Sequence, residues 1–275
     1  MNREIYDRIA NGEAAHFKQE RGLIAVWGKE SVQFLNGMIT NDVAKLGDGE
    51  EMLAAFPNAQ GRLIAIVRVR RDGDRFLFET EAATREKVFQ NLFRFTFAGD
   101  FFVEDLSDAY DYFSTFNSQL SNNGLKFTTG RMDGVFLPIG EVPSDSVEID
   151  SGTFETMRIE RGLPLYGVDC DDTTIVPELG IDGLISYTKG CYIGQEIIAR
   201  IHFRGHVAKQ LRGLDLSGMV EPGSELTADG KSAGRVTSVA PGSLAALGYV
   251  RYDHLADGTE LACGSAQAIV RSFVK

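Results

Sequence analysis

Cysteine is scarce in this chain of 275 residues. The three cysteines, Cys170, Cys191 and Cys263, lie far apart in the sequence and include no CxxC pair. This spacing argues against a disulfide framework and against a zinc knuckle, and it favours a reducing compartment. A stable iron–sulfur cluster needs about four thiolate ligands, which this chain does not supply by itself. We therefore expect no resident metal site.

The sequence also lacks long apolar runs and an excess of basic residues. No apolar run approaches the roughly 20 residues that span a bilayer, and residues 1–7 contain no apolar core of a signal peptide. Lysine and arginine total 28 against 39 acidic residues, a formal net charge of −11. This charge disfavours direct nucleic-acid binding but leaves room for a local basic pocket. We expect a soluble, cytoplasmic protein that is monomeric.

Hydrophobic patterning predicts an α+β fold in which helices cover antiparallel sheets. The Asp-Gly pair within residues 71–74 indicates a hairpin between two strands. Helices are expected to open within 28–31, to cover 84–95 after an N-cap at Thr84, to cover 153–160, and to begin within 190–195 and run through Arg200. The expected strands are 23–27, 52–56, 63–71, 75–79, 101–104, 110–116 and 134–138, with a turn-rich connection at 117–130.

The texture of the sequence changes beyond His206. Glycines there punctuate short segments that are rich in valine, leucine and alanine, a pattern typical of a small β-barrel. We place a boundary near residues 205–210. The predicted parts are 1–205, made of two intertwined subdomains at about 1–110 and 111–205, and a barrel at 206–275.

The most informative stretch runs from Lys189 to Glu196, with the sequence KGCYIGQE. A cysteine at the start of a helix meets unpaired backbone N–H groups that favour the thiolate, and Lys189 adds a cation, so Cys191 is a candidate reactive thiol. The alternative is a small residue that only packs. His202 is too far along the helix to act as a local base, and it and His206 fit satisfied residues at the domain junction better than catalytic ones.

Two further stretches carry polar side chains that suit ligand recognition. Glu160 lies in RIERGLPLYGVD, and a carboxylate in a partly closed pocket accepts two parallel N–H donors, such as those of a pterin. The alternative for Glu160 is a solvated ion pair. Asn41 and Asp42 follow the first expected helix, where short polar side chains commonly satisfy backbone groups of a loop.

These three stretches, in this order, resemble the YgfZ family within the superfamily of the glycine-cleavage T-protein. The resemblance covers nearly the whole chain, and KGCYIGQE matches the family signature without departure. It implies a T-protein-like ring of antiparallel-sheet subdomains with helices around a central channel, followed by the small barrel, with tetrahydrofolate or a one-carbon derivative in the channel. Arg200 suits the anionic folate tail by its charge. The resemblance implies a catalytic group of Cys191, Lys189, Gln195 and Glu196 and folate contacts from Glu160, Asn41, Asp42 and Tyr192, to which the charge of Arg200 adds a fifth.

One departure bears on activity. The T-proteins carry consecutive aspartates where this chain has Ala65 and Ile66. An aliphatic side chain neither holds nor exchanges a proton, so aminomethyl transfer is in doubt. The leading hypothesis is a tetrahydrofolate-binding accessory protein that supports assembly or repair of iron–sulfur clusters in client enzymes through a functional cysteine. The alternatives are a folate-dependent aminomethyl- or methyltransferase, a factor for tRNA modification that acts indirectly, and a shell that has lost its ligand.

Overall fold

The first sheet is built from strands that are contiguous in sequence and is covered on one face by two helices. The computed structural model describes residues 1–118 and 124–273. Alternate residues of the strands, such as Val67, Val69 and Phe78, pack against Val88 and Leu92 of the helix that follows β5. The sheet is antiparallel in the order β3-β4-β5-β2-β6. Its elements are β2 (Arg21–Trp27), α2 (Ser31–Met38), β3 (Glu51–Pro57), β4 (Leu63–Asp72), β5 (Arg75–Glu81), α3 (Ala82–Phe93) and β6 (Phe102–Asp105).

The second sheet combines an N-terminal strand with strands that come about a hundred residues later. Its order is β10-β1-β7-β9-β8, in which β1 pairs parallel with β10 and antiparallel with β7. Two helices pack on it through Ile9, Phe154 and Met157. Its elements are α1 (Arg3–Ala10), β1 (Ala15–Gln19), β7 (Tyr110–Phe116), β8 (Leu125–Phe127), β9 (Asp133–Pro138), β10 (Val147–Glu148) and α4 (Ser151–Glu160).

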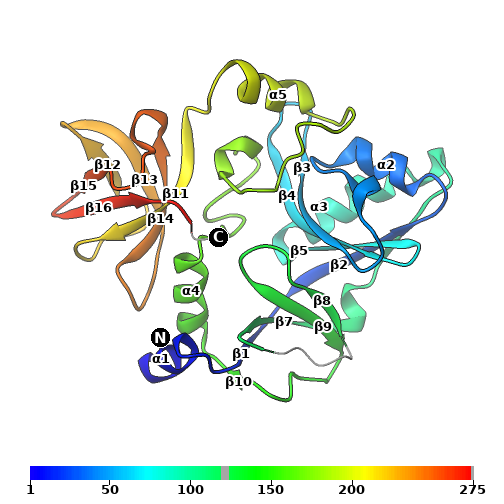
Figure 1. Cartoon of the computed structure of the whole chain (residues 1–275), viewed down its shortest axis with the longest axis horizontal. Helices are drawn as coiled ribbons and strands as arrows, with labels where there is room; N and C mark the ends of the chain where they lie inside the picture. The colour runs from blue at the N-terminus through cyan, green and yellow to red at the C-terminus, as the bar shows by residue number, and fades with distance from the viewer. Residues whose placement is uncertain (119–123, 274–275) are drawn as a thin grey trace.

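The C-terminal strands close into a six-stranded barrel in the order β11-β14-β13-β12-β15-β16. The barrel has its own apolar core, and it lies on the left of Figure 1, joined to the rest of the chain through α4 and the helix α5 (Gln195–Arg204). A buried network fixes the barrel to α4, because Arg158 and Ser238 both bond to Asp169. The barrel strands are β11 (Lys209–Leu216), β12 (Glu225–Ala228), β13 (Lys231–Val239), β14 (Ala245–Arg251), β15 (Glu260–Cys263) and β16 (Ala266–Arg271).

The α+β fold class, the C-terminal barrel and the hairpin after β4 are confirmed. The N-cap prediction at Thr84 is wrong, because α3 begins two residues earlier at Ala82 and its N-cap is Glu81. Patterning missed α1, β1 and the short strands β8 and β10. Part of the predicted connection at 117–130 lies outside the described residues, and the described part includes β8. The proposed domain boundaries stay a prediction. In the described part of the chain, no helix is long and apolar enough to cross a membrane.

Candidate functional site

A cavity of about 520 Å³ lies on the face of the first sheet that α2 and α3 do not cover. Residues from both sheets, from α4 and from the loops at 162–165 and 181–183 form its walls. Much of the wall is apolar, which suits a planar organic ring. The apolar lining includes Met52, Leu53, Ile66, Met132, Phe154 and Leu163. The charged lining consists of Arg21, Arg68, Glu79, Glu81, Arg131, Arg158 and Asp182.

Arg68 and Glu79 form the buried ionic centre of this wall. Arg68 lies on β4 directly opposite Glu79 on β5, and its Nε donates to Glu79 Oε2 at 2.6 Å. Arg21 from β2 bonds to the other carboxylate oxygen. Burial by itself raises the pKa of Glu79, but the two guanidinium groups outweigh it and lower that pKa to about 2. Glu79 is therefore ionised, and the group of three side chains carries a net positive charge.

The same arginine joins the two sheets. Its Nη2 donates to the hydroxyl of Tyr112 on β7 at 2.6 Å, and its Nη1 donates to the carbonyl oxygens of Phe127 at 3.1 Å and Met132 at 2.9 Å. With Glu79, four of the five N–H groups of Arg68 donate to acceptors on β5, on the second sheet or on the turn before β9. The buried guanidinium of Arg68 thus helps to fix the position of the second sheet over the first.

Glu81 is a second buried carboxylate in the cavity wall, with 9% of its surface exposed. It is the N-cap residue of α3, yet its side chain makes no capping hydrogen bond. Instead, its Oε2 accepts from the backbone N–H of Tyr166 at 3.0 Å. Burial raises the pKa of Glu81, and the positive charge of Arg21 opposes this effect. Among the described residues, Oε1 of Glu81 accepts no hydrogen bond.

Arg131 is a half-buried cation that, unlike Arg68, has few hydrogen-bond partners. Its Nη1 donates to the carbonyl oxygen of Gly162 at 2.8 Å, and its guanidinium lies over the ring of Phe273, 4.3 Å from the centroid. Within residues 1–118 and 124–273 it forms no ion pair. Burial lowers the pKa of Arg131, and the negative charge of Asp182 opposes this effect.

The two positions that depart from the T-protein pattern face different sides of the sheet. Ala65 is fully buried in the core beneath the helices. Ile66 is the next residue of β4, so its side chain points to the other face, and it lines the cavity. An aliphatic side chain therefore stands in the cavity at a position where the resemblance places a carboxylate.

The structure brings Lys189, Asn41 and Asp42 together at the end of α2. The Lys189 ammonium donates to the carbonyl oxygens of Asn36 at 2.8 Å, Ile39 at 2.7 Å and Asn41 at 2.8 Å. Burial lowers the pKa of Lys189 to about 8, against the opposing charge of Asp42. Because all three N–H donors are used, this cation satisfies carbonyls of the α2 C-terminus and is not directed at Cys191.

Asn41 connects this cluster to the cavity wall without lining it. Its Nδ2 donates to the carbonyl oxygens of Leu53 at 2.8 Å and Gly183 at 2.9 Å, both in cavity-lining residues. Asp42 caps the 3₁₀ turn Val43–Lys45 through the N–H of Ala44. Both side chains thus satisfy loop backbone groups.

Cys191 is exposed and lies four residues before the first residue of α5. It is therefore outside the helix N-terminus, contrary to the expected placement. The N-cap of the helix is Gly194, which has a φ of +80° and packs against the turn after β3, so that an added Cβ would lie 2.3 Å from the carbonyl oxygen of Asn58. Glycine is required there, so the signature fixes where α5 begins.

The other members of the signature take separate environments. Tyr192 is buried in a core with Leu63 and Ile198, where burial raises the pKa of its hydroxyl to about 12. Gln195 approaches the carbonyl oxygen of Gly190 at 3.4 Å, and Glu196 is exposed. None of the predicted catalytic residues lines the cavity.

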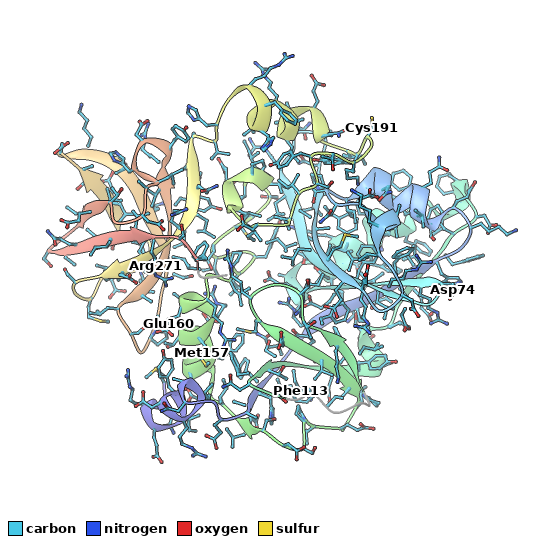
Figure 2. All side chains as sticks on the ribbon, in the orientation of Figure 1. Asp74, Phe113, Met157, Glu160, Cys191 and Arg271 are labelled. Carbon is cyan, nitrogen blue, oxygen red and sulfur yellow. The ribbon has the colours of Figure 1, made fainter. Side chains whose placement is uncertain are left out.

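Glu160 and Arg200 also lie outside the cavity lining. The Glu160 carboxylate accepts a hydrogen bond from the hydroxyl of Tyr6 on α1 at 2.6 Å. Arg200 is exposed on α5. Figure 2 shows Glu160 beside α4, above Met157, and Cys191 at the upper right, near α5, so the two predicted site groups are well separated. His202 stacks on Tyr187, with ring centroids 3.6 Å apart.

The charged residues of the cavity were missed by motif reasoning, although a signal for them exists. Arg68, Glu79 and Glu81 interrupt apolar strands at alternate positions, so they share one face of the sheet. A charge in the middle of a buried strand needs a partner, and a strand-by-strand inspection finds one opposite. Arg131 gave no such signal because it lies in a loop. No group of three or more His, Cys, Asp or Glu side chains in the described residues is placed to hold a metal ion.

Comparison with known proteins gives one domain match and several relatives. Residues 208–272 match the family described as the CAF17 C-terminal β-barrel domain. The chain is 27% identical to a mitochondrial iron–sulfur cluster assembly factor IBA57 homolog of Mycosarcoma maydis, over 74% of this chain and 58% of that protein. It is also 27% identical to the tRNA-modifying protein YgfZ of Hamiltonella defensa, over 69% of this chain and 66% of that protein. Each match thus spans less than two thirds of the relative.

The fold is that of a solved aminomethyltransferase. The glycine cleavage system aminomethyltransferase T of Bartonella henselae superposes with a TM-score of 0.82, covering 98% of this chain and 89% of the other at 19% sequence identity. At that identity the likeness concerns the fold alone. Together with the relatives, it confirms the predicted resemblance to YgfZ proteins and to the T-protein fold.

Proposed function

Because the chain is a relative of the YgfZ and IBA57 proteins and has the aminomethyltransferase T fold, we propose that it is a tetrahydrofolate-binding accessory protein for iron–sulfur cluster assembly or repair. The cavity between the two sheets is the folate site. Cys191 is the functional thiol, and it acts on client enzymes or assembly proteins at the surface. The cytoplasm is the proposed location.

The observation that carries this proposal is the composition of the cavity. Its volume of about 520 Å³ lies in the usual range for a small-molecule site. Its apolar walls suit a reduced pterin ring and an aminobenzoyl group, while its charged residues suit the donors and carboxylates of a folate. A bound folate supplies a one-carbon unit or a redox-active ring, and the residues of this chain bind it and exclude water.

Ile66 argues against the aminomethyltransferase alternative. A transferase needs a group that holds or moves a proton beside the one-carbon unit. The side chain of Ile66 has no such group, and the Glu79 carboxylate is held ionised by two arginines. The position at which the T-proteins carry their aspartate therefore has no proton carrier in this chain. Purified protein that consumed methylene-tetrahydrofolate with an amine or lipoyl acceptor would reverse this preference.

The name of the YgfZ relative favours a role in tRNA modification as the second candidate. The net charge of −11 disfavours direct contact with RNA. An indirect route, through client enzymes that modify tRNA and carry iron–sulfur clusters, is compatible with the names of both the IBA57 and the YgfZ relatives. Tight binding of tRNA with a steep salt dependence would favour direct action instead.

The test is calorimetric titration of tetrahydrofolate and 5-formyl-tetrahydrofolate into the wild-type protein, without oxygen and with reduced thiols. We expect a dissociation constant of about 1 μM, which corresponds to a binding free energy of about −8 kcal/mol. Ile66→Trp extends an indole into the cavity and should block ring binding, whereas Ile269→Trp on the exposed barrel surface is the matched control. Wild-type protein that binds neither folate contradicts the proposed site.

The link between folate and clusters needs a second measurement. In a strain that lacks the protein, the wild type and Ile269→Trp should restore the activity of iron–sulfur enzymes, and Ile66→Trp should not. Equal restoration by all three variants would separate the cavity from the cluster function.

A further inference from the structure

Two charged side chains in the cavity wall have unused hydrogen-bonding capacity. Glu81 uses one oxygen for the backbone N–H of Tyr166, and its other oxygen has no hydrogen bond among the described residues. Arg131 uses one of its five N–H donors, for Gly162. The remaining arginines of the wall differ, because Arg21 and Arg68 are paired with Glu79.

Arg158, the fourth arginine of the wall, is saturated as well. It forms ion pairs with Asp169 and Glu155, both at 2.9 Å, and it donates to the carbonyl oxygen of Leu163. It therefore has little capacity left for a ligand. The saturated charges hold the wall together, and the unsaturated ones are available to a bound molecule.

Charged side chains that line a cavity and keep unused hydrogen-bonding capacity suit ligand recognition, because a bound molecule can supply the missing partners. An ionised carboxylate has about four lone-pair sites, so Glu81, which uses one of them, can still accept two parallel N–H donors, the pattern of a 2-amino-4-oxopyrimidine edge. A guanidinium with free donors binds a carboxylate in a bidentate manner. The apolar lining contributed by Leu53, Ile66 and Met132 suits the rings that join these two ends in a folate.

We propose that Glu81 recognises the amino-pyrimidinone edge of the ligand and that Arg131 binds its anionic tail. This inference rests on the proposed folate site and assigns its polar recognition to residues other than the signature residues. Glu160, whose carboxylate is bonded to Tyr6, and Arg200, which is exposed on α5, lie outside that cavity.

The test measures the affinity of tetrahydrofolate for Glu81→Gln and Arg131→Gln by calorimetry. Each substitution should weaken binding at least tenfold. The controls are Glu86→Gln and Arg204→Gln, which make the same changes at exposed positions and should stay within twofold of the wild type. Loss that appears in Glu160→Gln or Arg200→Gln, with Glu81→Gln and Arg131→Gln binding normally, overturns the proposal.

Ligand analogues distinguish direct contact from a general loss of structure. Tetrahydrofolate without its 2-amino group should bind the wild type at least tenfold more weakly, but should bind Glu81→Gln about as well as tetrahydrofolate does. Tetrahydropteroate, which lacks the glutamate, should give the same pattern with Arg131→Gln. Equal losses in the variant and the wild type mean that the side chain does not contact that group.

Two outcomes distinguish a failure of this assignment from a failure of the proposed folate-binding function. If the wild type binds no folate, the proposed function fails and this assignment fails with it. If the wild type binds but neither Glu81→Gln nor Arg131→Gln weakens binding, only the assignment fails. Should Glu81→Gln not fold, Glu81→Asp keeps the charge, withdraws the carboxylate by one methylene and should also weaken binding at least tenfold.

Discussion

The cavity and the Cys191 loop divide the molecule into two regions with opposite physical character. The cavity wall is rich in buried charges that are paired across strands, as Arg68 and Glu79 are. The loop from Lys189 to Gly194 has one buried cation, Lys189, and places its cysteine in solvent. Sequence motifs pointed to the loop, whereas the enclosed space and the unsatisfied charges lie in the cavity.

This difference shows that a short signature and a ligand site need not coincide. KGCYIGQE contains residues whose positions depend on local geometry, such as the Lys189 bonds to α2 and the positive φ of Gly194. The cavity instead draws its residues one or two at a time from many elements. The signature residues are adjacent in sequence because they form one loop. The cavity residues are spread along the sequence because the walls come from separate strands and loops.

The largest expected effect comes from breaking the ionic centre of the cavity. Glu79→Gln leaves Arg21 and Arg68 without their carboxylate in a buried position. We expect the free energy of unfolding to fall by about 3 to 5 kcal/mol, measured by urea denaturation at pH 7. Glu86→Gln, at an exposed site on α3, should change it by less than about 0.5 kcal/mol.

The Glu79 carboxylate should also make the free energy of unfolding fall at acid pH. Its pKa is lowered from 4.5 to about 2, so its contribution is complete above pH 4.5 and is lost as pH falls from 4.5 towards 2. Glu79→Gln should therefore flatten the decline in stability within that window. An unchanged acid slope in the variant would show that Glu79 is not held ionised by the arginines.

An intermediate effect is expected at the base of the loop. Lys189→Met keeps the length of the side chain but removes all three donors, leaving the carbonyl oxygens of Asn36, Ile39 and Asn41 unsatisfied. Unfolding should become easier by about 1.5 to 3 kcal/mol. Amide hydrogen exchange in residues 186–194 should accelerate, whereas Lys45→Met, at a neighbouring exposed lysine, should leave that exchange unchanged.

The smallest effect on stability is expected at Cys191 itself. Cys191→Ser replaces an exposed thiol and should change the free energy of unfolding by less than about 0.5 kcal/mol. The variant should nevertheless fail to restore iron–sulfur enzyme activity in a strain that lacks the protein. Cys170→Ser, at a buried position, is the contrast and should be destabilised by about 1 to 3 kcal/mol. Full restoration by Cys191→Ser would remove the thiol from the function.

Patterning predicted the strands β2 to β7, because each alternates or runs apolar between clear turns such as Gly73–Asp74. The start of α3 was misplaced by two residues because a threonine that suits a cap follows two alanines that favour helix. That small shift matters, since it makes Glu81 an N-cap residue whose side chain turns away from its own helix. Sequence patterns within the helix do not predict this orientation of the Glu81 side chain.

The cavity itself was beyond reach of the sequence because it depends on how two sheets meet. The contacts of Arg131 depend on segments that are distant in sequence. Its neighbours Gly162 and Phe273 are such residues. Glu160 was expected in the ligand site from its motif, but the same residue is also in reach of α1, which patterning missed. Tyr6 on that helix bonds to its carboxylate.

The pairing of β1 with β7 sets an order of events during synthesis. Gln19 and Ser114 are bonded across these strands although they are 95 positions apart, and Asn2 bonds to Thr153 across 151 positions. The first sheet needs only residues 21–105, so it can form while the rest of the chain is still emerging from the ribosome. The N-terminal segment, although made first, must wait for partners that are synthesised about 95 to 151 residues later, and its closure is a slow, long-range step of folding.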